Sequence, residues 1–317
     1  MEKFIEVFFY MTNIVFMGTP DFAVPSLEAL HSAFGVKAVV TNPDKPQGRG
    51  LKLTPSPVKK AALALDIPIL QPQSLKNEEF QNELAALHPD IICVIAFKIL
   101  PKSVYSLGKI GTFNVHGSLL PRYRGAAPIQ WTIINGDKET GVTTFLLNDT
   151  VDTGNILLQK KYRIKENMTF GELYHELMPL AAEIAVETTS LLLTGQYSAS
   201  PQDNSLATPA PKIFRDQCMI DWNLPAQTVI NFIHGVSPIP AAWTYLPYGA
   251  VKIFACRLSE KQIPQGKFCI EDNRLFIGCA SNSCEITELQ IEGKPRMQVQ
   301  QFLNGYRGEK TGIMAKK

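Results

Sequence analysis

Short apolar segments alternate with helical patterns along the first hundred residues of this chain. The apolar segments cover residues 14–17, 36–41, 67–70 and 91–96, and helical periodicity covers residues 25–34, 58–65 and 78–87. Strands that are apolar throughout and separated by helices are typical of a parallel sheet covered by helices on both faces. The order predicts an α/β fold with an N-terminal doubly wound, Rossmann-like domain, whose site lies beyond the carboxyl ends of the strands.

The rest of the chain has a different pattern. Residues 169–193 form one predicted amphipathic helix, which Pro179 should kink or divide. Residues 195–211 have the Ser, Gln, Asn, Thr and Pro content of a linker. Beyond them, a helix over residues 227–234 precedes several short strands, a pattern that favours a small β-barrel. We therefore predict an α/β domain over residues 11–194, a linker over 195–211 and a barrel domain over 212–317.

Composition limits the classes of function. The chain has 317 residues and 45% hydrophobic content, enough for two domains with substantial cores. Its formal net charge is only +2, so a nucleic-acid partner would have to meet a local basic surface. The six cysteines form no Cys-x-x-Cys motif and no set with the spacing of a zinc site. These features predict a reduced, cytoplasmic protein without a structural metal.

The N-terminal ten residues are apolar but are interrupted by Glu6. This segment is too short to span a bilayer and lacks the cleavage site of a signal peptide. We expect it to be either an extension or a start-site artefact, and we expect no membrane span elsewhere in the chain.

Asn114, His116 and Asp152 are the residues with the clearest catalytic potential. Asn114 and His116 are two positions apart, so on a strand their side chains share one face. An Asn donor beside a His can hold the oxyanion that forms when an amine attacks a carbonyl, and a carboxylate can fix the tautomer of the His. Taken alone, Asn-x-His also fits an ordinary strand end, and Asp152-Thr153-Gly154 also fits a simple turn.

The segment Gly18-Thr19-Pro20-Asp21 follows the first predicted strand, where a dinucleotide fingerprint would lie. It does not match Gly-x-Gly-x-x-Gly, and Pro20 lacks the amide that a phosphate cradle would use. We therefore expect no nicotinamide cofactor.

Residues 41–60 form the most unusual predicted loop, with four prolines and two glycines. Its one acid is Asp44, and its cations are Lys45, Arg49, Lys52, Lys59 and Lys60. Proline stiffens such a loop and its cations can meet an anionic partner. A solvated surface loop is the alternative interpretation.

The whole stretch 112–154 resembles the folate-dependent formyltransferases, whose signature is Asn-x-His-x-Ser-Leu-Leu-Pro followed by an Asp in a short Gly-containing turn. Residues 14–23, 43–50 and 55–59 extend the resemblance toward the members that formylate the methionine of initiator tRNA. The resemblance implies 10-formyltetrahydrofolate as co-substrate, no metal, and catalysis by Asn114, His116 and Asp152. It places folate binding on Ser118, Leu119, Leu120 and Pro121.

The same resemblance implies a tRNA partner. The basic insertion, with Lys45, Arg49 and Lys52, would enter the acceptor stem, and Arg49 would probe its end. The C-terminal domain would be an OB-like barrel that holds the tRNA, with Lys212 at the domain junction as one contact. Pro209, and Pro238-Ile239-Pro240, depart from the pattern of many relatives, so further C-terminal contacts are not assigned.

We expect a cytoplasmic monomer that meets Met-charged initiator tRNA and the folate, and no membrane. Two alternatives stay open. The first is a folate-dependent formyltransferase that acts on a small-molecule amine, and the second is an RNA-binding module that has lost catalysis.

Overall fold

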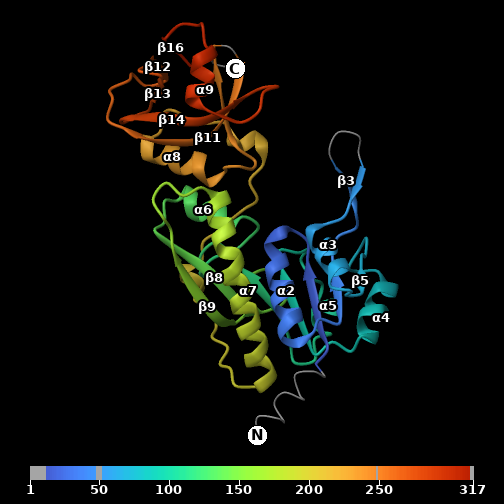
Figure 1. The fold of residues 1–317 in the computed structure, drawn as a ribbon. Coiled ribbons are helices and arrows are strands. Elements are labelled where there is room, and N and C mark those ends of the chain that lie inside the picture. Colours follow the sequence, from blue (N-terminus) through green and yellow to red (C-terminus); the bar gives the residue numbers. More distant parts are fainter. Residues whose placement is uncertain (1–11, 48–51, 248, 315–317) are drawn as a thin grey trace. The chain divides into compact units, whose positions relative to one another are not determined.

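The computed structural model describes residues 12–47, 52–247 and 249–314, and the chain divides into two compact units (Figure 1). The first contains the described residues up to Gly125, together with Gly141–Tyr162 and His175–Pro209. The second contains Ala126–Thr140, Arg163–Tyr174 and the described residues from Ala210 onward. The linear limits 11–194, 195–211 and 212–317 remain a prediction. The interpretations of residues 1–10 concern a segment outside the described residues.

A seven-stranded sheet organises the first unit. Its strands, in spatial order, are β5 (Ile69–Leu70), β2 (Ala38–Val40), β1 (Ile14–Gly18), β6 (Ile91–Ile95), β7 (Gly111–His116), β8 (Glu139–Leu146) and β9 (Ile156–Arg163). The five strands from β5 to β7 pair in parallel, whereas β7 pairs with β8 in antiparallel register. The predicted α/β fold class is confirmed, with a sheet that is mixed rather than wholly parallel.

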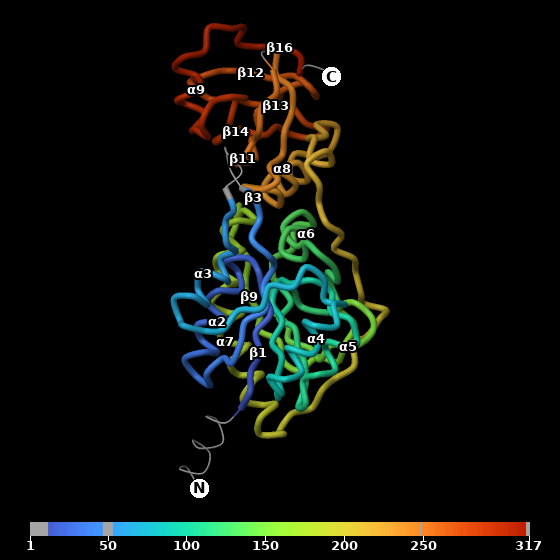
Figure 2. Tube along the Cα trace, turned by 90° about the vertical axis from the view of Figure 1, so that its right-hand side faces the viewer, coloured from blue at the N-terminus to red at the C-terminus, as the bar shows by residue number. Residues whose placement is uncertain are grey.

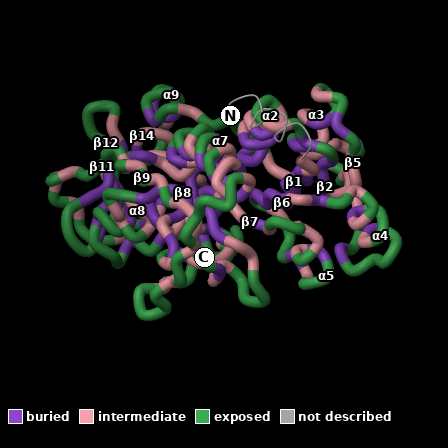
Figure 3. Tube along the Cα trace, turned by 90° about the horizontal axis from the view of Figure 1, so that it is seen from below, coloured by how far each residue is buried: buried purple, intermediate pink, exposed green. Residues whose placement is uncertain are grey.

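Helices cover both faces of this sheet. They are α2 (Val24–Phe34), α3 (Pro57–Ala64), α4 (Glu78–Ala86), α5 (Lys102–Tyr105) and α7 (Phe170–Thr194), and a short 3₁₀ turn, η1 (Asp21–Ala23), precedes α2. In Figure 3, α2, α3 and α7 lie on one side of the buried strands, and α4 and α5 lie on the other. Val15 and Met17 of β1 belong to the same buried cluster as Phe80 and Leu84 of α4, as the alternation of strand side chains requires.

Side-chain caps fix where two of these helices begin. The Ser56 hydroxyl accepts a hydrogen bond from the Lys59 amide at 3.0 Å, and Pro57 occupies the first turn of α3. The Asn77 side chain accepts from the Phe80 amide at 3.1 Å and starts α4. Such caps satisfy amides that a helix start leaves without partners.

Helix α7 remains one 25-residue helix although it contains Pro179, so Pro179 does not divide it, and the predicted alternative of a kink stays a prediction. By length and composition alone α7 could cross a membrane. The core helix of a soluble protein can have the same length and composition, and Leu177, Ile184 and Leu192 of α7 are buried in the protein. The Thr188 hydroxyl also bonds that of Thr144 on β8 at 2.8 Å.

The second unit is built on a curled antiparallel sheet. Its strands, in spatial order, are β10 (Ala242–Leu246), β11 (Gly249–Ser259), β14 (Ser283–Ile291), β13 (Arg274–Gly278), β12 (Lys267–Glu271) and β16 (Thr311–Ile313). A further strand, β15 (Met297–Gln298), pairs with β14. Helices α6 (Pro128–Ile134), α8 (Ala226–Gly235) and α9 (Val299–Gly305) complete it. Val229 and Ile233 of α8 share one buried cluster with Ile253 and Ile286 of the sheet. This arrangement agrees with the predicted OB-like domain.

Close packing joins α6 to α8 within the second unit (Figure 2). A Cβ added to Gly235 of α8 would lie 2.4 Å from a side-chain carbon of Ile134, so only glycine permits this approach. On the sheet, the buried Glu285 carboxylate accepts hydrogen bonds from Arg257 and Arg274. These two guanidinium groups lower the pKa of Glu285 to about 2, with Arg274 contributing most.

Candidate active site

Strand β7 carries Asn114 and His116 close to its carboxyl end. Asn114 is level with Val94 of β6 and Phe145 of β8, and His116 is level with Thr143 of β8. The two residues lie two positions apart on the strand and therefore share one face of the sheet. The Asn114 residue is half-buried and His116 is buried, so the site lies at the edge of the core.

The imidazole of His116 has two different neighbours. Its Nε2 atom lies 2.8 Å from the backbone oxygen of Tyr123. A carbonyl oxygen only accepts, so Nε2 carries the proton in this contact. Nδ1 lies 3.9 Å from a carboxylate oxygen of Asp152, which is within ion-pair range but too long for a hydrogen bond. In neutral His116, Nδ1 is therefore the basic atom, and it faces the side on which the carboxylate lies.

The residues that hold these two contacts have unusual backbones. Tyr123 is buried and has a φ of 64°, and Asp152 has a φ of 55°. Asp occurs in this left-handed region more often than most residues, whereas a Tyr there is an outlier that surrounding contacts must hold. The Gly125 amide donates to the same Asp152 oxygen that lies near His116, at 2.9 Å. The loop that contains Tyr123 thus contacts both the imidazole and the carboxylate.

The turn that bears Asp152 is tightly closed. The Asn148 side-chain oxygen accepts from the Thr150 amide and the Thr153 hydroxyl, both at 3.0 Å. Gly154 lies so close to β8 that an added Cβ would be 1.6 Å from the backbone oxygen of Leu146. Asp152-Thr153-Gly154 is therefore a turn, as its composition suggests, and it also brings the carboxylate to His116.

The predicted folate segment, residues 118–121, is pinned to β8 and β9. The Thr143 hydroxyl donates to the Ser118 carbonyl at 2.6 Å and accepts from the Leu120 amide at 3.1 Å. The side-chain amide nitrogen of Gln159 donates to the Leu120 carbonyl at 2.9 Å. Ser118 and Leu120 are buried, whereas Leu119 and Pro121 are half-buried.

Thr143 and Gln159 were not identified from the sequence. The available signal was the pair Thr143-Thr144 between the apolar residues Val142 and Phe145, which predicts buried side-chain hydrogen bonds.

The basic segment contains a hairpin that the sequence did not predict. Strands β3 (Lys45–Gln47) and β4 (Lys52–Thr54) pair in antiparallel register, and Lys45 is exposed. Arg49 lies outside the described residues. Lys52 lies on β4. Lys212 is exposed in the second unit, with its ammonium 5.1 Å from the ring centre of Phe214.

Lys59 has a structural role at the base of this hairpin. Its ammonium lies 2.8 Å from a carboxylate oxygen of Asp44, and Gln71 donates to the same carboxylate at 2.9 Å. These contacts, that of Gln71 first, lower the pKa of Asp44. Lys59 is thus engaged by the one acid of the segment.

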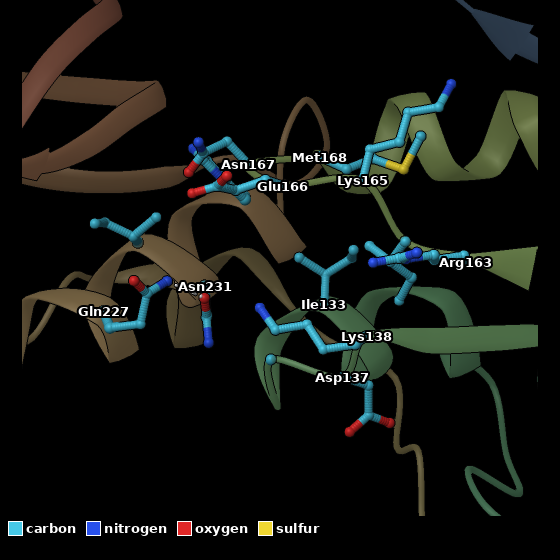
Figure 4. Close-up of a pocket in the computed structure, with 14 residues that line it drawn as sticks. Ile133, Asp137, Lys138, Arg163, Lys165, Glu166, Asn167, Met168, Gln227 and Asn231 are labelled. Atoms are coloured by element: carbon cyan, nitrogen blue, oxygen red, sulfur yellow. Dashed lines mark hydrogen bonds between the residues drawn. The ribbon is translucent and has the colours of Figure 1, made fainter.

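A separate hollow of about 630 Å³ lies within the second unit (Figure 4). The labelled side chains come from α6 and the turn after it, the end of β9, the loop before α7, and α8. Lys138, Arg163 and Lys165 contribute positive charge, and Asp137 and Glu166 contribute negative charge. Among the predicted site residues that the structure describes, none lines this hollow.

Two family models match the chain. One, described as formyl transferase, covers residues 12–189, and the other, described as formyl transferase, C-terminal domain, covers residues 212–307. The chain therefore belongs to the formyl transferase family and is an enzyme that transfers a formyl group. The resemblance to the folate-dependent formyltransferases is confirmed at this level.

Individual relatives extend the match along nearly the whole chain. The methionyl-tRNA formyltransferase of Porphyromonas gingivalis is 45% identical over 308 residues, covering 93% of this chain and 95% of its own. That of Parabacteroides distasonis is 45% identical over 311 residues, covering 93% and 96%. The solved structure of an N-formyltransferase from Helicobacter canadensis, in complex with folinic acid and dTDP-3-aminofucose, aligns with a TM-score of 0.67. At 21% identity over 87% of this chain and 98% of that one, it supports the fold.

Proposed function

We propose that the chain transfers the formyl group of 10-formyltetrahydrofolate to the amino group of methionine on initiator tRNA. The observation that carries this proposal is the 45% identity to methionyl-tRNA formyltransferases over almost the full length of both proteins. The folate donor is supported by the folinic acid bound in the related Helicobacter canadensis enzyme.

Asn114, His116 and Asp152 are the proposed catalytic residues. Nδ1 of His116 takes a proton from the attacking amine, because Nε2 is already committed to Tyr123. The imidazolium that results lies 3.9 Å from the Asp152 carboxylate, which stabilises its charge. The Asn114 amide and the imidazolium stabilise the negative charge that develops on the formyl oxygen. His116 then returns the proton to the nitrogen that leaves, so one proton is taken and one is given back.

The folate is proposed to lie against residues 118–121. Leu119 and Pro121 are half-buried and offer apolar surface, whereas Ser118 and Leu120 are buried. The Ser118 hydroxyl donates to the Arg122 carbonyl at 2.7 Å, so its role is to shape the segment. Thr143 and Gln159 keep the segment in place.

The tRNA is proposed to contact Lys45, Arg49, Lys52 and Lys212. Lys45 is exposed on β3, and Lys212 is exposed in the second unit. Lysine and arginine side chains neutralise phosphates, and arginine also bonds base edges. We further propose a cytoplasmic monomer. The six cysteines are free thiols, as in a reducing compartment, and one chain carries both regions of the family.

The alternative substrate is a small-molecule amine. The match to relatives with a tRNA substrate in their name, over both regions of the family, does not favour it. A formyl-transfer assay that offers Met-charged tRNA and a nucleotide-linked amino sugar in separate reactions tests the choice. Transfer to the amino sugar alone would overturn the proposed function.

A further inference from the structure

Residues 200–209, which the composition describes as part of a linker, contact both loops of the candidate active site. Ser200 pairs with Ile156, just after the Asp152 turn, through hydrogen bonds of 2.8 and 2.9 Å. The Thr208 carbonyl accepts from the Arg124 amide at 2.8 Å, and its hydroxyl accepts from the Tyr123 amide at 2.9 Å. This segment therefore fastens the loop that holds the imidazole and the turn that holds the carboxylate.

Gln202 lies between these attachments. Its side-chain amide nitrogen donates to the carbonyl of Asp152 at 3.0 Å and to that of Gly154 at 2.8 Å. Its side-chain oxygen accepts from Nε and Nη2 of Arg124, at 3.0 and 2.6 Å. Arg124 also donates to Asn204 at 2.9 Å. Both donors of Gln202 and its oxygen are engaged, which gives a half-buried side chain one orientation.

We propose that Gln202 is a positioning residue for catalysis, acting through the Asp152 turn with Arg124 as its anchor. The inference rests on the proposed role of Asp152. Asp152 has a left-handed backbone and reaches His116 across 3.9 Å, so a small shift of the turn changes the interaction between them. Gln202 holds the two carbonyls that flank Thr153 and thereby fixes where the carboxylate emerges.

The chemistry of the contacts requires a carboxamide. A glutamate of the same shape would keep the acceptor for Arg124 but would set an oxygen against the carbonyl oxygens of Asp152 and Gly154. An alanine would remove all four hydrogen bonds. Gln202→Glu therefore removes the hydrogen bonds to the Asp152 turn and keeps those from Arg124, whereas Gln202→Ala removes both sets.

The test compares Gln202→Glu and Gln202→Ala with Gln196→Ala, which changes an exposed glutamine shortly before residues 200–209. In formylation of Met-charged tRNA, we expect kcat of both Gln202 variants to fall by about tenfold or more, because misplacement of catalytic groups costs rate steeply. The KM values for tRNA and folate should stay near those of the wild type, and the thermal midpoint of each variant should stay well above the assay temperature. Gln196→Ala should match the wild type throughout.

Hydrogen exchange provides a readout that needs no substrate. The Gly125 amide, which donates to Asp152, should exchange faster in both Gln202 variants and at the wild-type rate in Gln196→Ala. Unchanged kcat and unchanged Gly125 exchange in the Gln202 variants would overturn the inference. If the wild type instead formylates only a small amine, the proposed substrate fails, and the same ratios measured with that amine decide the role of Gln202.

Discussion

Replacing Asp152 by Asn removes a charge from the candidate site while nearly preserving shape. The side-chain oxygen of Asn can still accept the Gly125 amide, which now bonds Asp152 at 2.9 Å. The change therefore isolates the electrostatic interaction between Asp152 and the His116 imidazolium. Both side chains are largely shielded from solvent, with 6% of His116 and 12% of Asp152 exposed.

The distance sets the size of the effect. Unit charges about 4 Å apart attract by about 4 kcal/mol at an effective dielectric constant of about 20. Each ~1.4 kcal/mol of barrier is tenfold in rate, so losing this attraction should lower kcat by about 10²–10³. The drop should appear with both substrates saturating, because the imidazolium forms during proton transfer.

Single-turnover formylation of Met-charged tRNA, with the thermal midpoint measured alongside, is the appropriate assay. Asp149→Asn is the matched control, since Asp149 is an exposed acid of the same loop that bonds the Tyr105 hydroxyl. The control should turn over near the wild-type rate. A folded Asp152→Asn variant with a similarly normal rate would refute the assignment of a charge-stabilised imidazolium to this site.

Three further predictions concern other parts of the chain. Asn114→Ala should lower turnover by about 10²–10³ through loss of an oxyanion donor, while tRNA still binds in a filter assay; normal turnover would remove Asn114 from catalysis. Arg49→Ala should raise KM for tRNA and leave folate affinity unchanged, and an unaltered tRNA titration would contradict its role. The pKa of Glu285 is lowered in the folded state, so its stabilisation is complete above its ordinary pKa of 4.5 and disappears as the pH falls toward about 2. The wild type should lose roughly 2–3 kcal/mol of its free energy of unfolding over this pH range through Glu285, a value reduced by solvent screening of the half-exposed arginines. We expect Glu285→Gln not to show this loss. Unfolding can be followed by the fluorescence of Trp131, Trp222 and Trp243, because all three lie in the second unit. The same pH dependence of unfolding in the wild type and in Glu285→Gln would be inconsistent with the ion-pair network.

Local patterns predicted most of the first unit. The apolar segments around Val15, Val39 and Cys93 became buried strands, and the helical patterns over residues 25–34 and 78–87 became α2 and α4. Strand direction was not accessible from periodicity. The antiparallel pairing of β7 with β8 depends on how the chain returns to the sheet, which side-chain alternation does not encode.

The missed elements have physical reasons. Lys45-Pro46-Gln47 has little β-propensity, so its side chains gave no signal for the strand that pairs with Lys52–Thr54. Pro179 removes one helical hydrogen bond from α7, but burial of residues such as Leu177 and Ile184 maintains the helix on both sides of it.

The candidate site could be predicted only in part from the sequence. The spacing of Asn114 and His116 on a strand implied a shared face, and the structure adds the 3.9 Å separation between His116 and Asp152. Gln202 could not be found, because its segment has the composition of a linker and its partners lie some 50 to 80 positions away in sequence. The positioning role proposed for Gln202 rests on these tertiary contacts alone.

The central claim is formyl transfer to the methionine of initiator tRNA. The most direct test measures transfer from 10-formyltetrahydrofolate to Met-charged initiator tRNA and to Met-charged elongator tRNA under the same conditions. We predict rapid formylation of the initiator and little of the elongator. Turnover of the folate with neither tRNA, but with a small amine, would contradict the claim.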